Sequence, residues 1–187
     1  MPIRRLFAHE QPLFAAHLKR LSDDDRRFRF ATTAVTDARI DSYVAGIAET
    51  DIVLGWFDGE GLSGAVHVAI GGGVAEIGVS VDAEQRGRGI GAALFHRAIR
   101  WARNRGAGRL YTLCLTDNLA MTALARKLGM TVHRESGTAE AFLPLDPPDL
   151  VTMSDELGSG VEAALHDWAG LMESCRELWR GVVRLPQ

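Results

Sequence analysis

The segment Gln85-Arg86-Gly87-Arg88-Gly89-Ile90-Gly91, here called the glycine-rich loop, contains residue types that bind phosphorylated ligands. Glycine lacks a Cβ, so a ligand can approach the backbone of this loop closely. A helix is expected to begin here, and its first N–H groups have no partner inside the helix. Those N–H groups and the helix dipole attract phosphate, and the two arginines add positive charge. We therefore predict that this loop binds an anionic cofactor.

Other interpretations of the glycine-rich loop differ in what it would bind. As a plain turn before a surface helix it would bind nothing. Gly87, Gly89 and Ala92 also fit the spacing of a dinucleotide fingerprint, with Asp117 after the next strand, and a nicotinamide cofactor would then bind. That fingerprint has its first glycine directly after a buried strand, whereas the polar segment 82–88 intervenes here. A Walker phosphate loop is excluded, because the sequence contains no Gly-Lys-Ser/Thr.

The residues on both sides of the glycine-rich loop predict the elements that hold it. From Ala75 to Asp82, hydrophobic residues alternate with polar residues or glycine, which is the two-residue period of a strand. After the loop, hydrophobic residues at helical spacing predict an amphipathic helix over Gly89–Arg105. The segment Leu110–Leu115 predicts the next strand. Because a helix connects these two strands, we expect them to be parallel.

The glycine-rich loop after an Ala-Glu-Ile strand resembles motif A of the GNAT superfamily of N-acetyltransferases. Strand Leu110–Leu115, Asn118 and the segment 123–130 resemble motif B, which usually has the pattern Asn…Leu-Tyr-x-Lys-Leu-Gly-Phe. The resemblance covers residues 3–145. The segment Leu21–Phe30 is similar to the N-terminal part of bacterial protein-lysine acetyltransferase domains, which favours a lysine acceptor.

The resemblance implies the GNAT fold, an α/β (α+β) fold whose mixed, mostly antiparallel central sheet is flanked by helices. Local patterns predict the remaining elements. Strands are predicted at Ile3–Phe7, Ile52–Phe57, Leu62–Ile70, Met130–Arg134 and Glu140–Leu145, and helices at His9–Leu21, Thr36–Ile47 and Asn118–Leu128. Ser22 is expected to cap a further helix, which is either a solvated surface helix or, as the resemblance implies, a lid over the acceptor site. We assign residues 1–150 to the acetyltransferase domain and 151–187 to a C-terminal amphipathic helical extension.

Hydrophobic residues in the C-terminal extension recur at alternating spacings of four and three. They are Val161, Leu165, Trp168, Met172, Cys175, Trp179 and Val182. This heptad seam predicts a helix from Val161 to Val183. We expect the helix either to pack on the acetyltransferase domain or to form the contact of a homodimer.

The resemblance also implies where acetyl-CoA, the acyl donor, would bind. The two predicted parallel strands would diverge past their midpoint, and the pantetheine arm would bond the backbone of Val79 and Val81 like an added strand. The pyrophosphate would contact the N–H groups of the loop, which belong to Arg86, Gly87, Arg88, Gly89, Ile90 and Gly91. Asn118 either touches the pantetheine arm or only caps its helix.

Acetyl transfer to an amine requires a neutral amine and a polarised thioester carbonyl. Glu76 on the central strand matches the base of the histone-acetylating branch, and would remove the amine proton directly or through water. Its alternative role is a surface carboxylate or an arginine partner. The N–H of Val79 is the candidate for stabilising the oxyanion. Many members have a tyrosine as the acid for the departing thiolate, but Ala125 occupies that position, so the acid is unassigned.

Two functions follow from these residues. The first is acetyl transfer from acetyl-CoA to a primary amine, a protein lysine or a small molecule, by direct attack in a ternary complex. Direct attack is preferred because no serine or cysteine has a convincing nucleophile motif. The second is a non-catalytic acyl-CoA-binding sensor or scaffold, which the missing tyrosine favours. His67, on the strand before the central one, either lines the acceptor pocket or is a core or surface histidine.

Composition limits the remaining classes of partner, cofactor and cellular location. The 187 residues suffice for a domain with a sizeable core, and the net charge of −3 indicates no general affinity for nucleic acid or anionic membranes. Cys114 and Cys175 are expected to stay reduced. No cluster of potential ligands has metal-binding spacing, so no metal is expected. The sequence shows no secretory signal or transmembrane run, so we expect a cytoplasmic protein.

Overall fold

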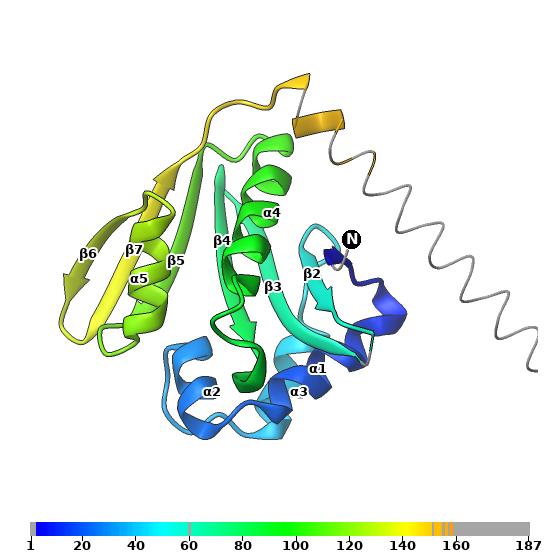
Figure 1. The fold of residues 1–187 in the computed structure, drawn as a ribbon, viewed down its shortest axis with the longest axis vertical. Helices are drawn as coiled ribbons and strands as arrows, with labels where there is room; N and C mark the ends of the chain where they lie inside the picture. Colours follow the sequence, from blue (N-terminus) through cyan, green and yellow to red (C-terminus); the bar gives the residue numbers. More distant parts are fainter. Residues whose placement is uncertain (1–2, 60, 151, 155, 157, 159–187) are drawn as a thin grey trace, which may run out of the picture.

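Seven strands form one mixed sheet in the order β1-β2-β3-β4-β5-β7-β6 (Figure 1). They are β1 (Ile3–Arg5), β2 (Ile52–Phe57), β3 (Leu62–Gly71), β4 (Val74–Val81), β5 (Arg109–Leu115), β6 (Thr131–Glu135) and β7 (Thr138–Pro144). Strands β4 and β5 are parallel, and the other neighbouring pairs are antiparallel. This computed structural model describes residues 3–59, 61–150, 152–154, 156 and 158. The predicted mixed, mostly antiparallel sheet is confirmed.

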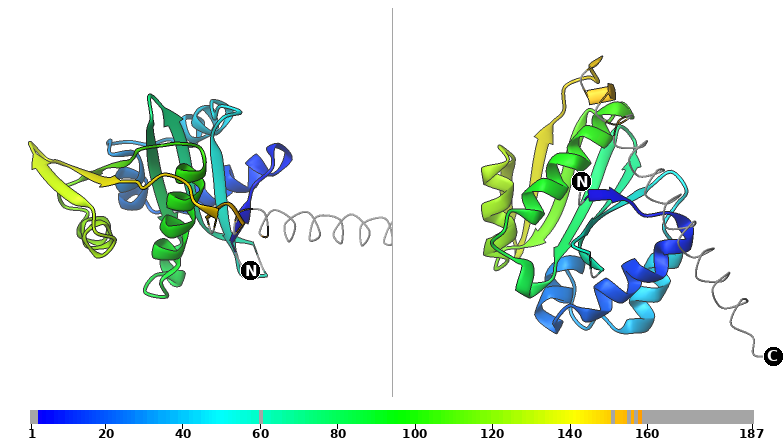
Figure 2. Two further views of the ribbon diagram at one scale, coloured as in Figure 1. Left: turned by 90° about the horizontal axis from the view of Figure 1, so that it is seen from above. Right: turned by 45° about the vertical axis from the view of Figure 1, so that its right-hand side comes forward.

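Among the described residues, five α-helices flank the sheet. They are α1 (Gln11–Arg20), α2 (Asp23–Phe30), α3 (Asp37–Ala45), α4 (Ile90–Asn104) and α5 (Leu119–Lys127), with short 3₁₀ turns at Ala8–Glu10 and Ala83–Gln85. Helix α4 runs across one face of the central strands (Figure 2) and contacts β2, β3 and β4. Helices α1 and α3 pack together, and α1 contacts β3. Within the described part of the chain, no helix is long and apolar enough to cross a membrane.

Each face of the sheet has its own hydrophobic core, as the strand period requires. On the α4 face, Leu94 and Phe95 pack with Val66 and Ile77. On the opposite face, side chains of α1 and α3 pack with Ala65, the residue next to Val66 in β3. Successive β3 residues therefore enter opposite cores, because side chains alternate across a strand.

Strands β4 and β5 pair along only part of their length. The parallel register joins Val74 to Arg109 and ends where Glu76 is opposite Tyr111. Strand β4 remains paired with β3 as far as Val81, and β5 remains paired with β7 as far as Leu115. Beyond Glu76 the two parallel strands therefore diverge, which leaves the β5-facing edge of β4 without a strand partner.

Helix α2 lies beside the carboxyl ends of β4 and β5 (Figure 1). The Ser22 side chain accepts a hydrogen bond from the backbone N–H of Asp25, which confirms the predicted cap. Two ion pairs hold the helix in place: Arg27 Nη2 is 2.6 Å from Asp117 Oδ2, and Asp25 Oδ1 is 2.7 Å from Arg86 Nη2. Helix α2 is therefore tied both to the glycine-rich loop and to the turn after β5.

The two strands predicted at Met130–Arg134 and Glu140–Leu145 are confirmed as the antiparallel pair β6 and β7, whereas the first helix differs from its predicted bounds. The first helix begins at Gln11 after a 3₁₀ turn, because Pro12 lacks an N–H and is accommodated in a first turn. In the last hairpin, β7 inserts between β5 and β6. The predicted C-terminal helix and its homodimer contact lie outside the described residues.

Candidate active site

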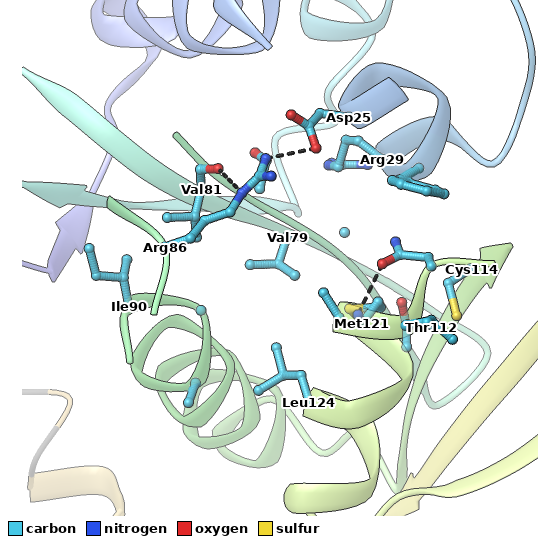
Figure 3. A pocket seen from close by; sticks show the side chains of 18 of the residues that line it. Asp25, Arg29, Val79, Val81, Arg86, Ile90, Thr112, Cys114, Met121 and Leu124 are labelled. Carbon is cyan, nitrogen blue, oxygen red and sulfur yellow. Dashed lines mark hydrogen bonds and ion pairs between the residues drawn. The ribbon is translucent and has the colours of Figure 1, made fainter. Parts of the chain in front are cut away.

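A cavity of about 470 Å³ lies where β4 and β5 diverge (Figure 3). Its lining comes from α2, β4, the glycine-rich loop, α4, β5 and α5. On the β4 side it is lined by Gly78, Val79, Ser80 and Val81, and on the β5 side by Thr112, Leu113 and Cys114. The structure thus places Val79 and Val81 at the divergence, as the sequence predicts. The Val81 carbonyl accepts a hydrogen bond from Arg86 Nε at 3.3 Å.

The glycine-rich loop forms the end of the cavity at the start of α4. Gly89 is the N-cap of α4 and has a φ of 81°, and Gly87 has a φ of 76°. Both angles are in the left-handed region that favours glycine. Because glycine supplies no capping oxygen, the first N–H groups of α4 remain available to an anion. A Cβ on either glycine would project into open space, where a ligand would approach.

The predicted loop residues divide into two groups. Five of them line the cavity: Arg86, Gly87, Gly89, Ile90 and Gly91. The Arg88 side chain is not among the lining residues and donates a hydrogen bond to Gln85 Oε1. Lys127, at the end of α5, is a further cation of the lining that the sequence did not reveal. The lining near the loop therefore contains the cations Arg86 and Lys127, of which Arg86 is paired with Asp25.

The structure shows the capping role of Asn118 and places the residue in the cavity lining. Its Oδ1 accepts a hydrogen bond from the Met121 N–H at 3.0 Å, which caps α5. It also lines the cavity. Since the cap engages Oδ1, the side-chain nitrogen is the group that can reach a ligand.

Glu76 lies at the last paired position of β4, opposite Tyr111. Its side chain is exposed, and it shares a face of β4 with Gly78, two residues on. Glu76 is not among the residues that line the cavity. Burial, Glu140 and Glu76 together raise the pKa of Tyr111 above its usual value. The carboxylate therefore lies on the strand that borders the site, outside the cavity lining itself.

The position of the missing tyrosine is closed off from the cavity. Ala125 is 1% exposed and belongs to the core on the α4 face. Thr112 and Cys114 are the buried polar residues on the β5 side of the lining. Cys114 is a free thiol whose pKa is raised by burial, as expected for a reduced core cysteine. These side chains supply no strong acid for a leaving thiolate.

Sequence reasoning missed a hydrogen-bonded chain that runs from the cavity to β3. Arg29 of α2, which lines the cavity, donates from Nη2 to the Tyr43 hydroxyl at 2.8 Å. The Tyr43 oxygen is 2.7 Å from Nδ1 of His67, and Nε2 of His67 is 3.2 Å from Asp51 Oδ2. Burial and the charge of Arg29 lower the pKa of His67. His67 therefore does not line the cavity but reaches it through Tyr43 and Arg29.

A second buried polar cluster joins α1 to β4. His17 is fully buried, with Nε2 2.9 Å from Ser80 Oγ and Nδ1 3.1 Å from Asp82 Oδ1. Burial alone would raise the pKa of Asp82, but His17 and Arg20 lower it below its usual value. We interpret this cluster as an anchor that fixes the end of β4 against α1.

Comparison with known proteins gives one consistent family. Residues 5–130 match the model of the Acetyltransferase (GNAT) family. Among solved structures, the GNAT domain of S. lividans PAT is 21% identical with a TM-score of 0.66, over 76% of this chain and 89% of that one. The ribosomal-protein-S18-alanine N-acetyltransferase from Escherichia coli is 18% identical with a TM-score of 0.60, over 79% and 96%.

A third similar structure was solved with the expected acyl donor. It is a phosphinothricin acetyltransferase from Sinorhizobium meliloti in complex with AcCoA, 18% identical with a TM-score of 0.59, over 80% of this chain and 95% of that one. At these identities the likeness to the solved structures is one of fold.

Proposed function

Because this chain belongs to the acetyltransferase (GNAT) family of enzymes, we propose that it transfers an acetyl group from acetyl-CoA to a primary amine. The observation that carries the proposal is the cavity between the diverging strands β4 and β5. It combines an unpaired strand edge with an uncapped helix N-terminus. An acyl donor with an amide-containing arm and a pyrophosphate needs both features.

The cavity lining fits the two parts of acetyl-CoA. The β4 edge at Val79 and Val81 would bond the pantetheine arm as a further strand does. The pyrophosphate would contact the first N–H groups of α4, because the N–H groups at a helix N-terminus bind anions. Arg86 and Lys127 in the lining supply positive charge for the phosphates, and Asn118 would donate from its side-chain nitrogen to the arm. In this proposal Arg88 contributes its backbone N–H and general positive charge.

The proposed reaction forms a C–N bond and breaks a C–S bond in one ternary complex. The neutral amine attacks the thioester carbonyl, whose oxygen the Val79 N–H stabilises. A lysine-like amine with a pKa near 10.4 is mostly charged at neutral pH, so a base must remove its proton. We assign this role to Glu76, which acts from the exposed edge of the site, directly or through water. The thiolate leaves and takes a proton from water, because no side chain is assigned as the acid.

The test of the proposed function is amine-dependent thiol release. Acetyl-CoA is incubated with the protein and a panel of amines, and free CoA is measured with a thiol reagent. We expect release that requires an amine and a matching N-acetylated product by mass spectrometry. Binding of CoA without turnover on any amine would instead support the acyl-CoA-binding sensor or scaffold, which the buried Ala125 at the tyrosine position favours.

A thermal-shift measurement separates acetyl-CoA from a nicotinamide cofactor. A ligand that binds the folded state raises its stability in proportion to the logarithm of ligand concentration over Kd. We expect CoA to raise the Tm and NAD to leave it unchanged. Protection by NAD alone would support the dinucleotide interpretation of Gly87, Gly89 and Ala92.

Arg86 should contribute more to CoA binding than Arg88. Arg86 lines the cavity, whereas Arg88 does not and its side chain is engaged by the Gln85 side chain. We expect Arg86→Gln to weaken CoA binding about tenfold, since charge-assisted hydrogen bonds to phosphate are strong, and Arg88→Gln to have a smaller effect. Titration calorimetry at two salt concentrations measures both. Equal losses for the two variants would contradict the assignment of the Arg86 side chain to the phosphates.

Two expectations about the whole protein remain proposals. A cytoplasmic location follows from the sequence analysis. A homodimer contact through residues 161–183 would appear in the molar mass measured by light scattering, and would disappear when those residues are removed.

A further inference from the structure

Helix α2 carries three arginines, and two of them have carboxylate partners. Arg26 Nη1 is 2.9 Å from Asp37 Oδ1, and Arg27 Nη2 is 2.6 Å from Asp117 Oδ2. For Arg29 there is no carboxylate partner among the residues that the structure describes. Arg29 is nevertheless the one of the three whose side chain lines the cavity. The uncompensated guanidinium is therefore in the proposed reaction site.

Arg29 packs directly against the central strand. Its guanidinium lies on the backbone of Gly78, and a Cβ at this position would overlap it. Gly78 precedes Val79, whose N–H we place at the thioester carbonyl. The side chain of Arg29 thus extends from α2 towards the part of β4 where the acetyl group would be transferred (Figure 3).

The hydrogen-bonded chain behind Arg29 orients the guanidinium. The Asp51 carboxylate is an acceptor, so Nε2–H of His67 donates to it. Burial and Arg29 lower the pKa of His67, which favours a ring whose Nδ1 accepts from the Tyr43 hydroxyl. Tyr43 in turn accepts from Arg29 Nη2. The hydrogen-bonded chain ends on the Asp51 carboxylate. Tyr43 and His67 separate that carboxylate from Arg29, so it does not pair with the guanidinium.

Among the described residues, no acceptor meets the remaining donors of Arg29. Its Nε is buried and without a hydrogen-bond partner, and Nη1 donates to no described residue. The guanidinium also lies over the rings of Phe30 and Tyr43, with Cζ 5.3 Å and 5.4 Å from their centroids. A partly buried cation without an anionic partner is nevertheless unfavourable. The other charges of the lining do not compensate it, because Asp25 is paired with Arg86 at 2.7 Å. A guanidinium in this position matches a carboxylate, which accepts two parallel N–H bonds.

We propose that Arg29 binds a carboxylate of the acceptor, so that the acceptor is a small amine with a carboxylate, such as an amino acid. The proposal rests on the acetyl transfer proposed above and specifies its substrate class. The site favours a small molecule because α2 covers it, and the Asp25–Arg86 and Arg27–Asp117 ion pairs tie α2 to both sides of the cavity. This differs from the lysine acceptor that the segment Leu21–Phe30 favours.

Matched acceptors test the proposal. The kcat/KM of acetylation is measured for free L-amino acids, for their carboxamides and for a lysine-containing peptide. A carboxamide is neutral and cannot form the charge-assisted pair with Arg29. We therefore expect kcat/KM to be about 10–100-fold higher for an acid than for its carboxamide. Equal values for acid and carboxamide, or a preference for the peptide, would overturn the inference while acetyl transfer itself stands. No acetylation of any amine would overturn both.

Two variants remove the guanidinium in different ways. Arg29→Gln deletes its charge, and Gly78→Ala displaces it by the overlap described above. For both we expect kcat/KM to fall about 10–100-fold more for the acid than for the carboxamide. Arg39→Gln, the same change on the exposed surface of α3, should alter neither. An equal loss for acid and carboxamide in both variants would show a structural role and overturn the proposal.

Discussion

Turnover should fall about 10²–10⁴-fold in Glu76→Gln, which is the usual contribution of a general base, while CoA affinity stays unchanged. Glutamine has nearly the same shape as glutamate but cannot take the amine proton. The Glu76 side chain makes no hydrogen bond or ion pair with another described residue, so the change breaks no such interaction. Steady-state rates with saturating acetyl-CoA and CoA titrations measure the two effects separately.

The pH dependence of the same variant distinguishes a base from a structural residue. As the pH rises towards the pKa of the acceptor, more of the amine is already neutral and needs no base. The deficit of Glu76→Gln should therefore shrink at high pH. Glu135→Gln, the same change at an exposed position of β6, serves as the control. An unchanged rate in Glu76→Gln, or a deficit that is constant with pH, would remove Glu76 from the mechanism.

Gly89→Val should abolish detectable CoA binding. Gly89 has a φ of 81° at the start of α4, a conformation that β-branched residues rarely adopt. Its missing Cβ also leaves the open space through which the pyrophosphate would reach the helix N–H groups. The substitution would fill that space and turn the N–H groups away. Titration calorimetry measures the loss, with circular dichroism to verify the fold.

The matched control for Gly89→Val lies at the other end of the same helix. Gly106 follows α4, has a φ of 74° and likewise faces open space, but it is not part of the cavity lining. Gly106→Val should produce similar backbone strain and leave CoA affinity intact. If Gly89→Val bound CoA normally, or if both variants lost binding equally, the loop would not be the phosphate site.

Local patterns predicted the elements around the site because each pattern is set by neighbours in the sequence. The alternation over residues 75–82 predicted β4 and its face. Ser22 and Asn118 were predicted to cap α2 and α5, and both do. The glycines of the loop predicted the start of α4 correctly, since a positive φ and an absent side chain are properties of single residues.

Contacts between distant residues explain what the sequence did not reveal. Arg29, Tyr43, His67 and Asp51 come from four separate segments and meet only in the folded chain. The insertion of β7 between β5 and β6 depends on pairing preferences that local patterns do not contain. Side-chain direction was also inaccessible, which is why Arg86 and Arg88 appeared equivalent in the sequence although only Arg86 lines the cavity.

Hydrogen exchange with and without CoA tests the central claim, that the divergence of β4 and β5 holds the acyl donor. The account predicts slower exchange of the amides of residues 77–81 and 86–91 when CoA is bound, and no change with NAD. Gly89→Val should abolish this protection. CoA binding that leaves both segments unprotected and protects another part of the chain would contradict the account.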